Sequence, residues 1–126
     1  MKNIRILIAI TSLALVINGC YYDEEILEGD GGVPTNVSLV NDVQPIFDLN
    51  CNKSGCHDAA PSHDPSLVKE NAYLALKQGG YINTTVAEQS VLYQVIAEGN
   101  MPPSGALAQK DLNIILGWIR EGAKNN

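Results

Sequence analysis

The chain has 126 residues, a formal net charge of −6 at pH 7 and an aromatic content of 6%, with one Trp and one Phe. This length allows one small domain. So few large side chains give a small apolar core. Small domains with a limited hydrophobic core usually depend on a disulfide, a metal or a cofactor for their stability. The negative charge argues against nucleic acid, and against an anionic membrane surface, as a partner.

The first 19 residues have the pattern of a signal peptide. Lys2 and Arg5 supply a short basic segment, and an almost unbroken apolar run follows over residues 6–17. The run is too short for a bilayer span, which needs about 20 residues. Residues 1–19 are therefore predicted to direct export of the chain and to be removed.

The end of this segment, Ile17-Asn18-Gly19-Cys20, resembles the lipobox of bacterial lipoproteins. The resemblance implies cleavage before Cys20 and lipidation of its thiol, which would attach the protein to a membrane. The alternative is an ordinary secretory signal followed by an unrelated cysteine. The lipoprotein interpretation places the chain in the cell envelope of a Gram-negative bacterium, at the periplasmic face of a membrane or on the outer membrane.

Residues 20–40 are predicted to be a tether between the lipid and a folded domain at residues 41–124. The segment is rich in acids and glycines and shows no sustained hydrophobic period, which favours a flexible linker. Its acidic cluster, Asp23-Glu24-Glu25, also resembles a surface-export signal of Bacteroidetes lipoproteins. A solvated acidic linker is the alternative.

The chemistry of the chain is concentrated in Cys51-Asn52-Lys53-Ser54-Gly55-Cys56-His57. Two nearby cysteines with a histidine directly after the second form a covalent haem attachment signature, usually C-x-x-C-H. Both thiols can add to the haem vinyl groups, and the adjacent imidazole reaches one face of the iron. Here four residues, not two, separate the cysteines. The longer loop leaves the adjacency of Cys56 and His57 unchanged.

Three cysteines in an exported chain leave one without a partner. Assigning Cys20 to lipid leaves Cys51 and Cys56 as a pair. Two interpretations other than haem stay open for this pair. One is a plain disulfide with His57 as a surface residue. The other is a zinc site, which needs four ligands and could be completed only by His63 and nearby acids.

The hydrophobic pattern of residues 41–124 predicts helices and no convincing strand, so the expected class is all-α. Asn41-x-x-Gln44 fits a capping box, and a first helix from there would lead into Cys51. Further helices are expected at 70–78, 88–97 and 110–122. The last has the strongest period, with apolar residues at i, i+3, i+4 and i+7: Leu112, Ile115, Leu116 and Ile119.

The order of these features resembles a known family. The helix reading DVQPIF, the cysteine and histidine motif, a middle helix ending in Gly79-Gly80, the segment SVLYQVIAEGNMPP and a final helix with WIREGA follow one another. This is similar to the small monohaem c-type cytochrome domain, in particular the lipoprotein-borne type of Bacteroidetes, over about residues 41–123. The resemblance implies a cytochrome c-like fold, with about four short helices around one covalently bound haem c.

The resemblance also implies the role of each site residue. Cys51 and Cys56 match the thioether positions, His57 the proximal iron ligand, and Met101 of the MPP loop the distal ligand. A thioether opposite a histidine raises the haem potential and suits electron transfer. His63 is the competing distal ligand, but it lies only six residues past His57, and a solvated loop histidine is the simpler interpretation.

Iron with ligands on both faces has no position for substrate, so the expected function is one-electron transfer and not enzymatic catalysis. The expected partners are redox proteins, met by a free carrier or within a respiratory complex. Two alternatives belong to other classes. One is a haem enzyme, or a sensor of peroxide or a gas, in which Met101 does not bind the iron. The other is a structural or binding lipoprotein without haem, with a Cys51–Cys56 disulfide.

Overall fold

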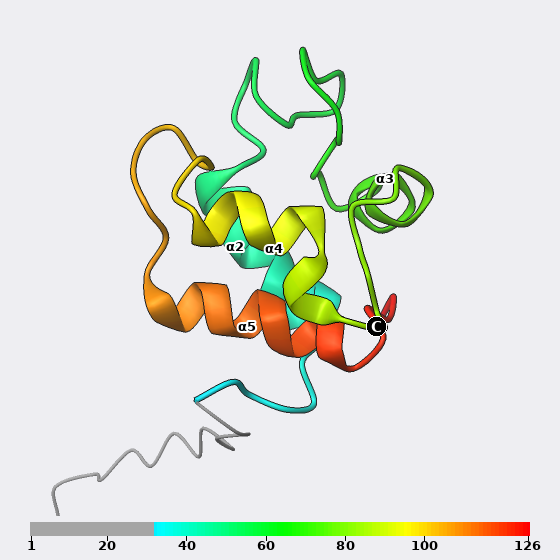
Figure 1. The fold of residues 1–126 in the computed structure, drawn as a ribbon. Coiled ribbons are helices and arrows are strands. Elements are labelled where there is room, and N and C mark those ends of the chain that lie inside the picture. Colours follow the sequence, from blue (N-terminus) through cyan, green and yellow to red (C-terminus); the bar gives the residue numbers. More distant parts are fainter. Residues whose placement is uncertain (1–31) are drawn as a thin grey trace, which may run out of the picture.

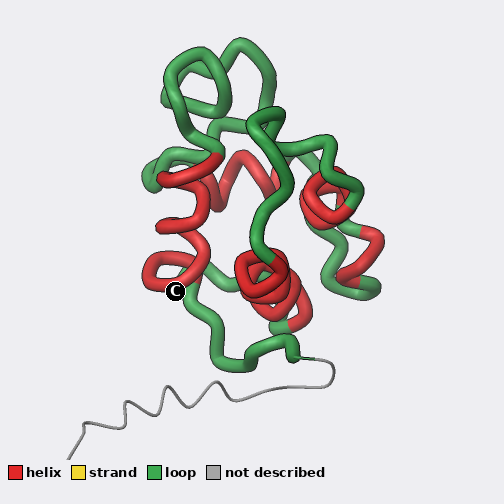
Figure 2. The backbone as a smooth tube through the Cα atoms, turned by 90° about the vertical axis from the view of Figure 1, so that its left-hand side faces the viewer, coloured by secondary structure: helices red, strands yellow, loops and turns green. Residues whose placement is uncertain are grey.

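The computed structural model describes residues 32–126, and this part of the chain consists of helices joined by loops (Figure 1). Its helices are α2 (Gln44–Asn50), α3 (Ala72–Gln78), α4 (Val91–Ala97) and α5 (Gln109–Arg120). Two short turns precede helices: the π-helical η1 (Leu39–Val43) before α2, and the 3-10 turn η2 (Ala87–Gln89) before α4. Residues 32–126 contain no β-strand, which confirms the all-α class for this part (Figure 2).

The predicted signal peptide, the lipidation of Cys20 and the tether up to residue 31 lie outside the described residues. Within residues 32–126, no helix combines the length and the hydrophobicity that crossing a membrane would require.

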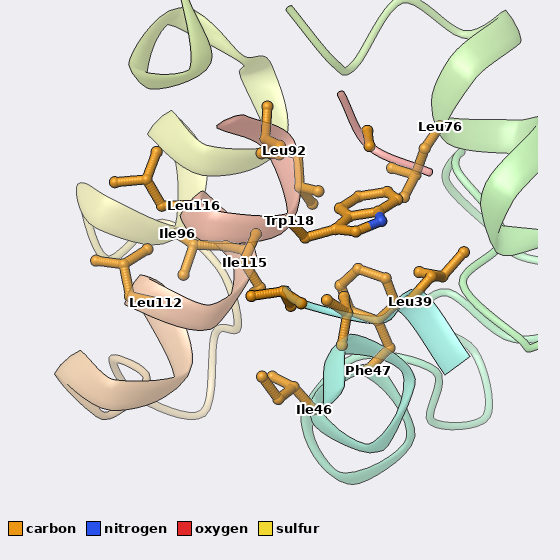
Figure 3. Close-up of a cluster of buried hydrophobic side chains, with 14 of the residues drawn as sticks. Leu39, Ile46, Phe47, Leu76, Leu92, Ile96, Leu112, Ile115, Leu116 and Trp118 are labelled. Carbon is orange, nitrogen blue, oxygen red and sulfur yellow. The ribbon is translucent and has the colours of Figure 1, made fainter. Parts of the chain in front are cut away.

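Helix α5 carries the centre of the core. Its buried face has the period that the sequence predicted, with Leu112, Ile115, Leu116 and Ile119 all buried. Trp118 is also fully buried and belongs to the same cluster as Phe47 of α2 and Leu76 of α3 (Figure 3). The indole Nε1 of Trp118 donates to the carbonyl of Lys124 at 2.8 Å, so its burial leaves no polar group without a partner. Each such large apolar side chain contributes roughly 1.5–3 kcal/mol.

The helical segment before the cysteine motif begins earlier than predicted. Ser38 is the N-cap of η1: its Oγ accepts from the backbone N–H of Asn41 at 3.2 Å, and the Asp42 carboxylate accepts from the N–H of Ser38 at 2.7 Å. The expected capping box at Asn41 and Gln44 is therefore wrong, because this reciprocal pair forms three residues upstream. Gln44 is buried instead, and its amide donates to the carbonyl of Leu67 at 3.0 Å.

Residues 32–38, here called the N-terminal strap, lie against α5 although the sequence assigned them to the tether. Val33 and Val37 are buried in the main core. The Glu121 carboxylate accepts from the N–H groups of Asn36 and Val37, at 2.5 and 2.9 Å. A Cβ on Gly117 would lie 2.4 Å from a backbone oxygen of the strap, so only glycine allows this approach. Packing thus begins before the predicted boundary at residue 41.

The chain end also contacts this region. Asn126 accepts hydrogen bonds from Ser38, Leu39 and Val40, at 2.8, 3.0 and 2.9 Å. Packing therefore extends past the predicted end at residue 124, and the two ends of the described chain are held together beside α5.

The third predicted helix, 88–97, is divided in the structure. Ser90 has an extended backbone, with ψ at 131°, and separates η2 from α4. Its buried Oγ accepts from the N–H of Asn83 at 2.8 Å. This bond fixes the loop between α3 and α4, so that α4 begins at Val91 and presents Leu92 and Ile96 to the interior.

Candidate functional site

A pocket of about 390 Å³ lies among the end of α2, the loop that follows it, α4 and the loop after α4. Small-molecule sites usually have about 300–1,000 Å³. Its inner wall is aliphatic, formed by buried Leu67, Leu76, Leu92 and Ile96. Such a surface favours a large apolar ligand, since no polar group on it loses water when the ligand binds.

The four residues predicted to hold a cofactor all line this pocket: Cys51, Cys56, His57 and Met101. Cys51 is the C-cap of α2, and Met101 follows α4. The fold therefore brings together the two sequence features that the prediction combined, although they are far apart in the chain.

The imidazole of His57 is held in a defined orientation. Its Nδ1 lies 2.8 Å from the carbonyl oxygen of Pro65, which is buried. A carbonyl can only accept, so Nδ1 carries the proton and the lone pair is on Nε2. Metal-binding histidines commonly have this second bond, which fixes the tautomer and leaves one nitrogen for the metal. The backbone N–H of His57 also donates to the carbonyl of Cys51, at 3.3 Å.

The two additional residues between the cysteines are accommodated by a turn. The N–H of Cys56 donates to the carbonyl of Lys53 at 2.9 Å, and Gly55 between them has φ of +78°. A positive φ is easy for glycine and strained for most other residues. The Asp58 carboxylate accepts from the N–H of Gly55 at 2.9 Å. The longer spacing is thus absorbed on the solvent side, and Cys56 still lines the pocket.

Both motif cysteines are free thiols, Cys51 half-buried and Cys56 exposed. Burial raises the pKa of the Cys51 thiol to about 11, so this sulfur is protonated at neutral pH and is a poor thiolate nucleophile. Among residues 32–126, no three His, Cys, Asp or Glu side chains are grouped as a metal ion would require. The disulfide and the zinc interpretations stay alternatives to the haem interpretation.

The two candidate distal ligands reach the pocket from different segments. Met101 is 38% exposed, and its backbone N–H donates to the carbonyl of Val95 at 2.9 Å, which fixes the loop to α4. His63 is exposed, as expected for a loop histidine, yet it also lines the pocket. It belongs to the loop that carries His57 and Pro65, whereas Met101 comes from a separate wall. This origin favours Met101 as the partner of His57.

Among the pocket residues that the sequence analysis missed are Pro65, which orients His57, and Tyr81, whose half-buried ring lines the pocket. No spacing or period in the sequence connects either residue to the cysteine motif. Their positions depend on the paths of the loops after α2 and after α3.

Comparisons of the chain with protein-family models, with curated proteins and with solved structures found no match. The functional interpretation therefore rests on the residues of the pocket and on their geometry. The cytochrome c-like fold and the role of each cofactor ligand stay predictions.

Proposed function

We propose that this protein is a c-type cytochrome, a one-electron carrier with a single haem attached covalently in the pocket. The observation that carries the proposal is the hydrogen bond between His57 Nδ1 and the Pro65 carbonyl, within a pocket that Met101 also lines. This bond leaves Nε2 of His57 with the lone pair that an iron ligand requires.

The pocket residues fit this cofactor. Aliphatic side chains suit a flat macrocycle that is mostly apolar, and a volume of about 390 Å³ suits a ligand of substantial size. Cys51 and Cys56 are in the wall, where their thiols can form the two thioether bonds. The raised pKa of Cys51 is compatible with this role, because a thioether sulfur carries no charge.

When bound, haem supplies an iron that changes between the ferrous and ferric states. The protein's own residues set the conditions for that change. His57 is oriented by Pro65, and Met101 offers a thioether, the type of axial ligand that raises the potential. Leu76, Leu92 and their neighbours exclude water. If His57 and Met101 both held the iron, they would leave no position for a substrate, so the proposed activity is electron transfer.

Redox proteins are the proposed partners. The exposed part of the pocket wall includes Cys56, Val91 and Met101, where the edge of the cofactor would be closest to a docked protein. Contacts between electron-transfer partners are small and transient. Lipidation of Cys20 in the cell envelope completes the proposal and keeps the carrier beside its membrane.

Expression of the full chain in cells with cytochrome maturation machinery tests the function. The expected product keeps haem stain on a denaturing gel, has the mass of the chain plus one haem, and has a low-spin ferric spectrum. The control is the Cys51→Ala, Cys56→Ala double variant, which should lose the stain. An intact mass without haem in the unsubstituted protein would disprove the proposal. A high-spin ferric spectrum would instead indicate an enzyme or sensor with an open sixth position.

A further inference from the structure

The cysteine motif has two more residues than the usual haem attachment signature, and the carboxylate of Asp58 holds the turn that accommodates them. We infer that Asp58 is a positioning residue for haem attachment: it fixes this turn so that the Cys56 thiol lies where the second thioether bond forms. The inference rests on the proposed function, because the thiol has this role only if the pocket takes haem.

Both oxygens of the Asp58 carboxylate accept backbone hydrogen bonds. Oδ2 accepts from the N–H of Gly55 at 2.9 Å, and Oδ1 accepts from the N–H of Ala60 at 3.1 Å. The backbone carbonyl of Asp58 accepts from the buried hydroxyl of Ser66 at 2.7 Å. The half-buried Asp58 is therefore joined to the turn before it and to the loop after it.

The turn that Asp58 holds contains the additional residues of the motif. Residues 53–55 are exposed, and Gly55 has a φ of +78°. Glycine loses more conformational freedom than any other residue when its backbone is fixed, and a longer loop costs more entropy to close. Nevertheless the N–H of His57 reaches the carbonyl of Cys51, at 3.3 Å. The long motif thus needs a stabilising interaction that a two-residue spacing would not need.

The hydrogen bonds of this turn are local in sequence. The bond from Gly55 to Asp58 spans three residues, and so does the bond from the N–H of Cys56 to the carbonyl of Lys53. A side chain that accepts from a nearby backbone N–H can form such a turn without tertiary contacts. This property suits a domain whose core is small without its cofactor, since the turn does not depend on the finished fold.

The position of the thiol matters because of the reaction that joins it to haem. The S–H group adds across the C=C bond of a vinyl group: the sulfur bonds to the carbon beside the ring, and the proton goes to the terminal carbon. No group leaves, and nothing is oxidised or reduced overall. The reaction requires the sulfur close to one particular carbon, and Asp58 holds the residue directly before Cys56.

The test compares four forms of the full chain, expressed in cells with cytochrome maturation machinery. They are the unsubstituted chain, Asp58→Ala, a chain shortened by deletion of Lys53 and Ser54, and the shortened chain with Asp58→Ala. The deletion restores the two-residue spacing, so the shortened pair is the matched control. Each product is denatured and treated with N-ethylmaleimide, and peptide mapping gives the fraction of haem-bearing chains in which the Cys56 thiol is free and has reacted.

At the natural spacing, Asp58→Ala should raise the fraction with a free Cys56 thiol several-fold or prevent haem attachment. In the shortened pair it should change nothing, because no long turn remains to be held. Asp58→Asn should restore attachment, since its amide oxygen can accept from the N–H of Gly55.

An equal fraction of free Cys56 in Asp58→Ala and the unsubstituted chain, or an equal rise at both spacings, would overturn the role of Asp58 alone. If the shortened chains acquire no haem, failure of Asp58→Asn to restore attachment would overturn it instead. Absence of haem from all four chains would overturn the proposed function as well.

Discussion

The haem-free domain is predicted to have little or no stable folded state. The perturbation is expression of the unsubstituted chain in cells that lack cytochrome maturation, which leaves Leu67, Leu76, Leu92 and Ile96 facing the pocket without a ligand. At about 24 cal/mol per Å³ of cavity, a volume of about 390 Å³ corresponds to a loss of about 9 kcal/mol. Because the pocket opens to solvent, this value is an upper limit. Small domains have only about 5–15 kcal/mol in total.

The assay is urea unfolding followed by far-ultraviolet circular dichroism, on haem-free and haem-loaded protein of identical sequence. The haem-loaded protein should unfold in one cooperative transition. The haem-free protein should show a shallow change with no folded baseline, because most of the domain's stability is lost with the ligand. The Cys51→Ala, Cys56→Ala variant should behave like the haem-free protein.

A haem-free protein that unfolds cooperatively at nearly the same urea concentration would refute this reasoning. It would mean that the core around Trp118 and Phe47 is sufficient by itself and that the pocket closes or fills with water at small cost. The fold would then be independent of the cofactor, and the sparse aromatic content would not indicate a need for one.

Three further predictions concern single residues. Met101→Ala should abolish the charge-transfer band of a Met–Fe(III) bond in the ferric spectrum, whereas His63→Ala should retain it; retention of the band in Met101→Ala would exclude that ligand. Glu121→Gln should lower the free energy of unfolding by about 1–3 kcal/mol, because one backbone N–H of the strap loses its acceptor, and the exposed control Glu70→Gln should change it little. Gly117→Ala should cost about 1–3 kcal/mol, since the added methyl meets a strap carbonyl; an unchanged urea midpoint would show that the strap moves freely.

Much of the local structure could be predicted from the sequence. The period of Leu112, Ile115, Leu116 and Ile119 correctly indicated the buried face of α5, because a helical period depends only on neighbours within two turns. The MPP segment was expected to lie in a loop, and residues 100–105 contain no helix or strand, since two prolines and a glycine disfavour regular structure. The adjacency of Cys56 and His57 is a property of the chain itself, and no folding is needed to know it.

Other features were missed because they depend on contacts between distant segments. The helical segment before the motif begins at Ser38 and not at Asn41, and the Ser38 hydroxyl also donates to the carbonyl of Asn126, 88 residues further along the chain. The strap has the composition of a linker. Its few apolar side chains become buried only when the strap packs against α5, at the contacts with Gly117 and Glu121. Residues 32–38 have no hydrophobic periodicity from which their packing against α5 could be predicted.

For the candidate site, the sequence by itself determined which atoms are available: two thiols, an imidazole next to the second, and one thioether after residue 20. Only the tertiary structure decided that these groups share a pocket, that Pro65 orients His57 and that Tyr81 lies in the wall. The physical reason is that a hydrogen bond about 3 Å long depends on the complete path of both segments that it joins. A residue's identity gives its chemistry, and the packing of the loops decides where that chemistry can act.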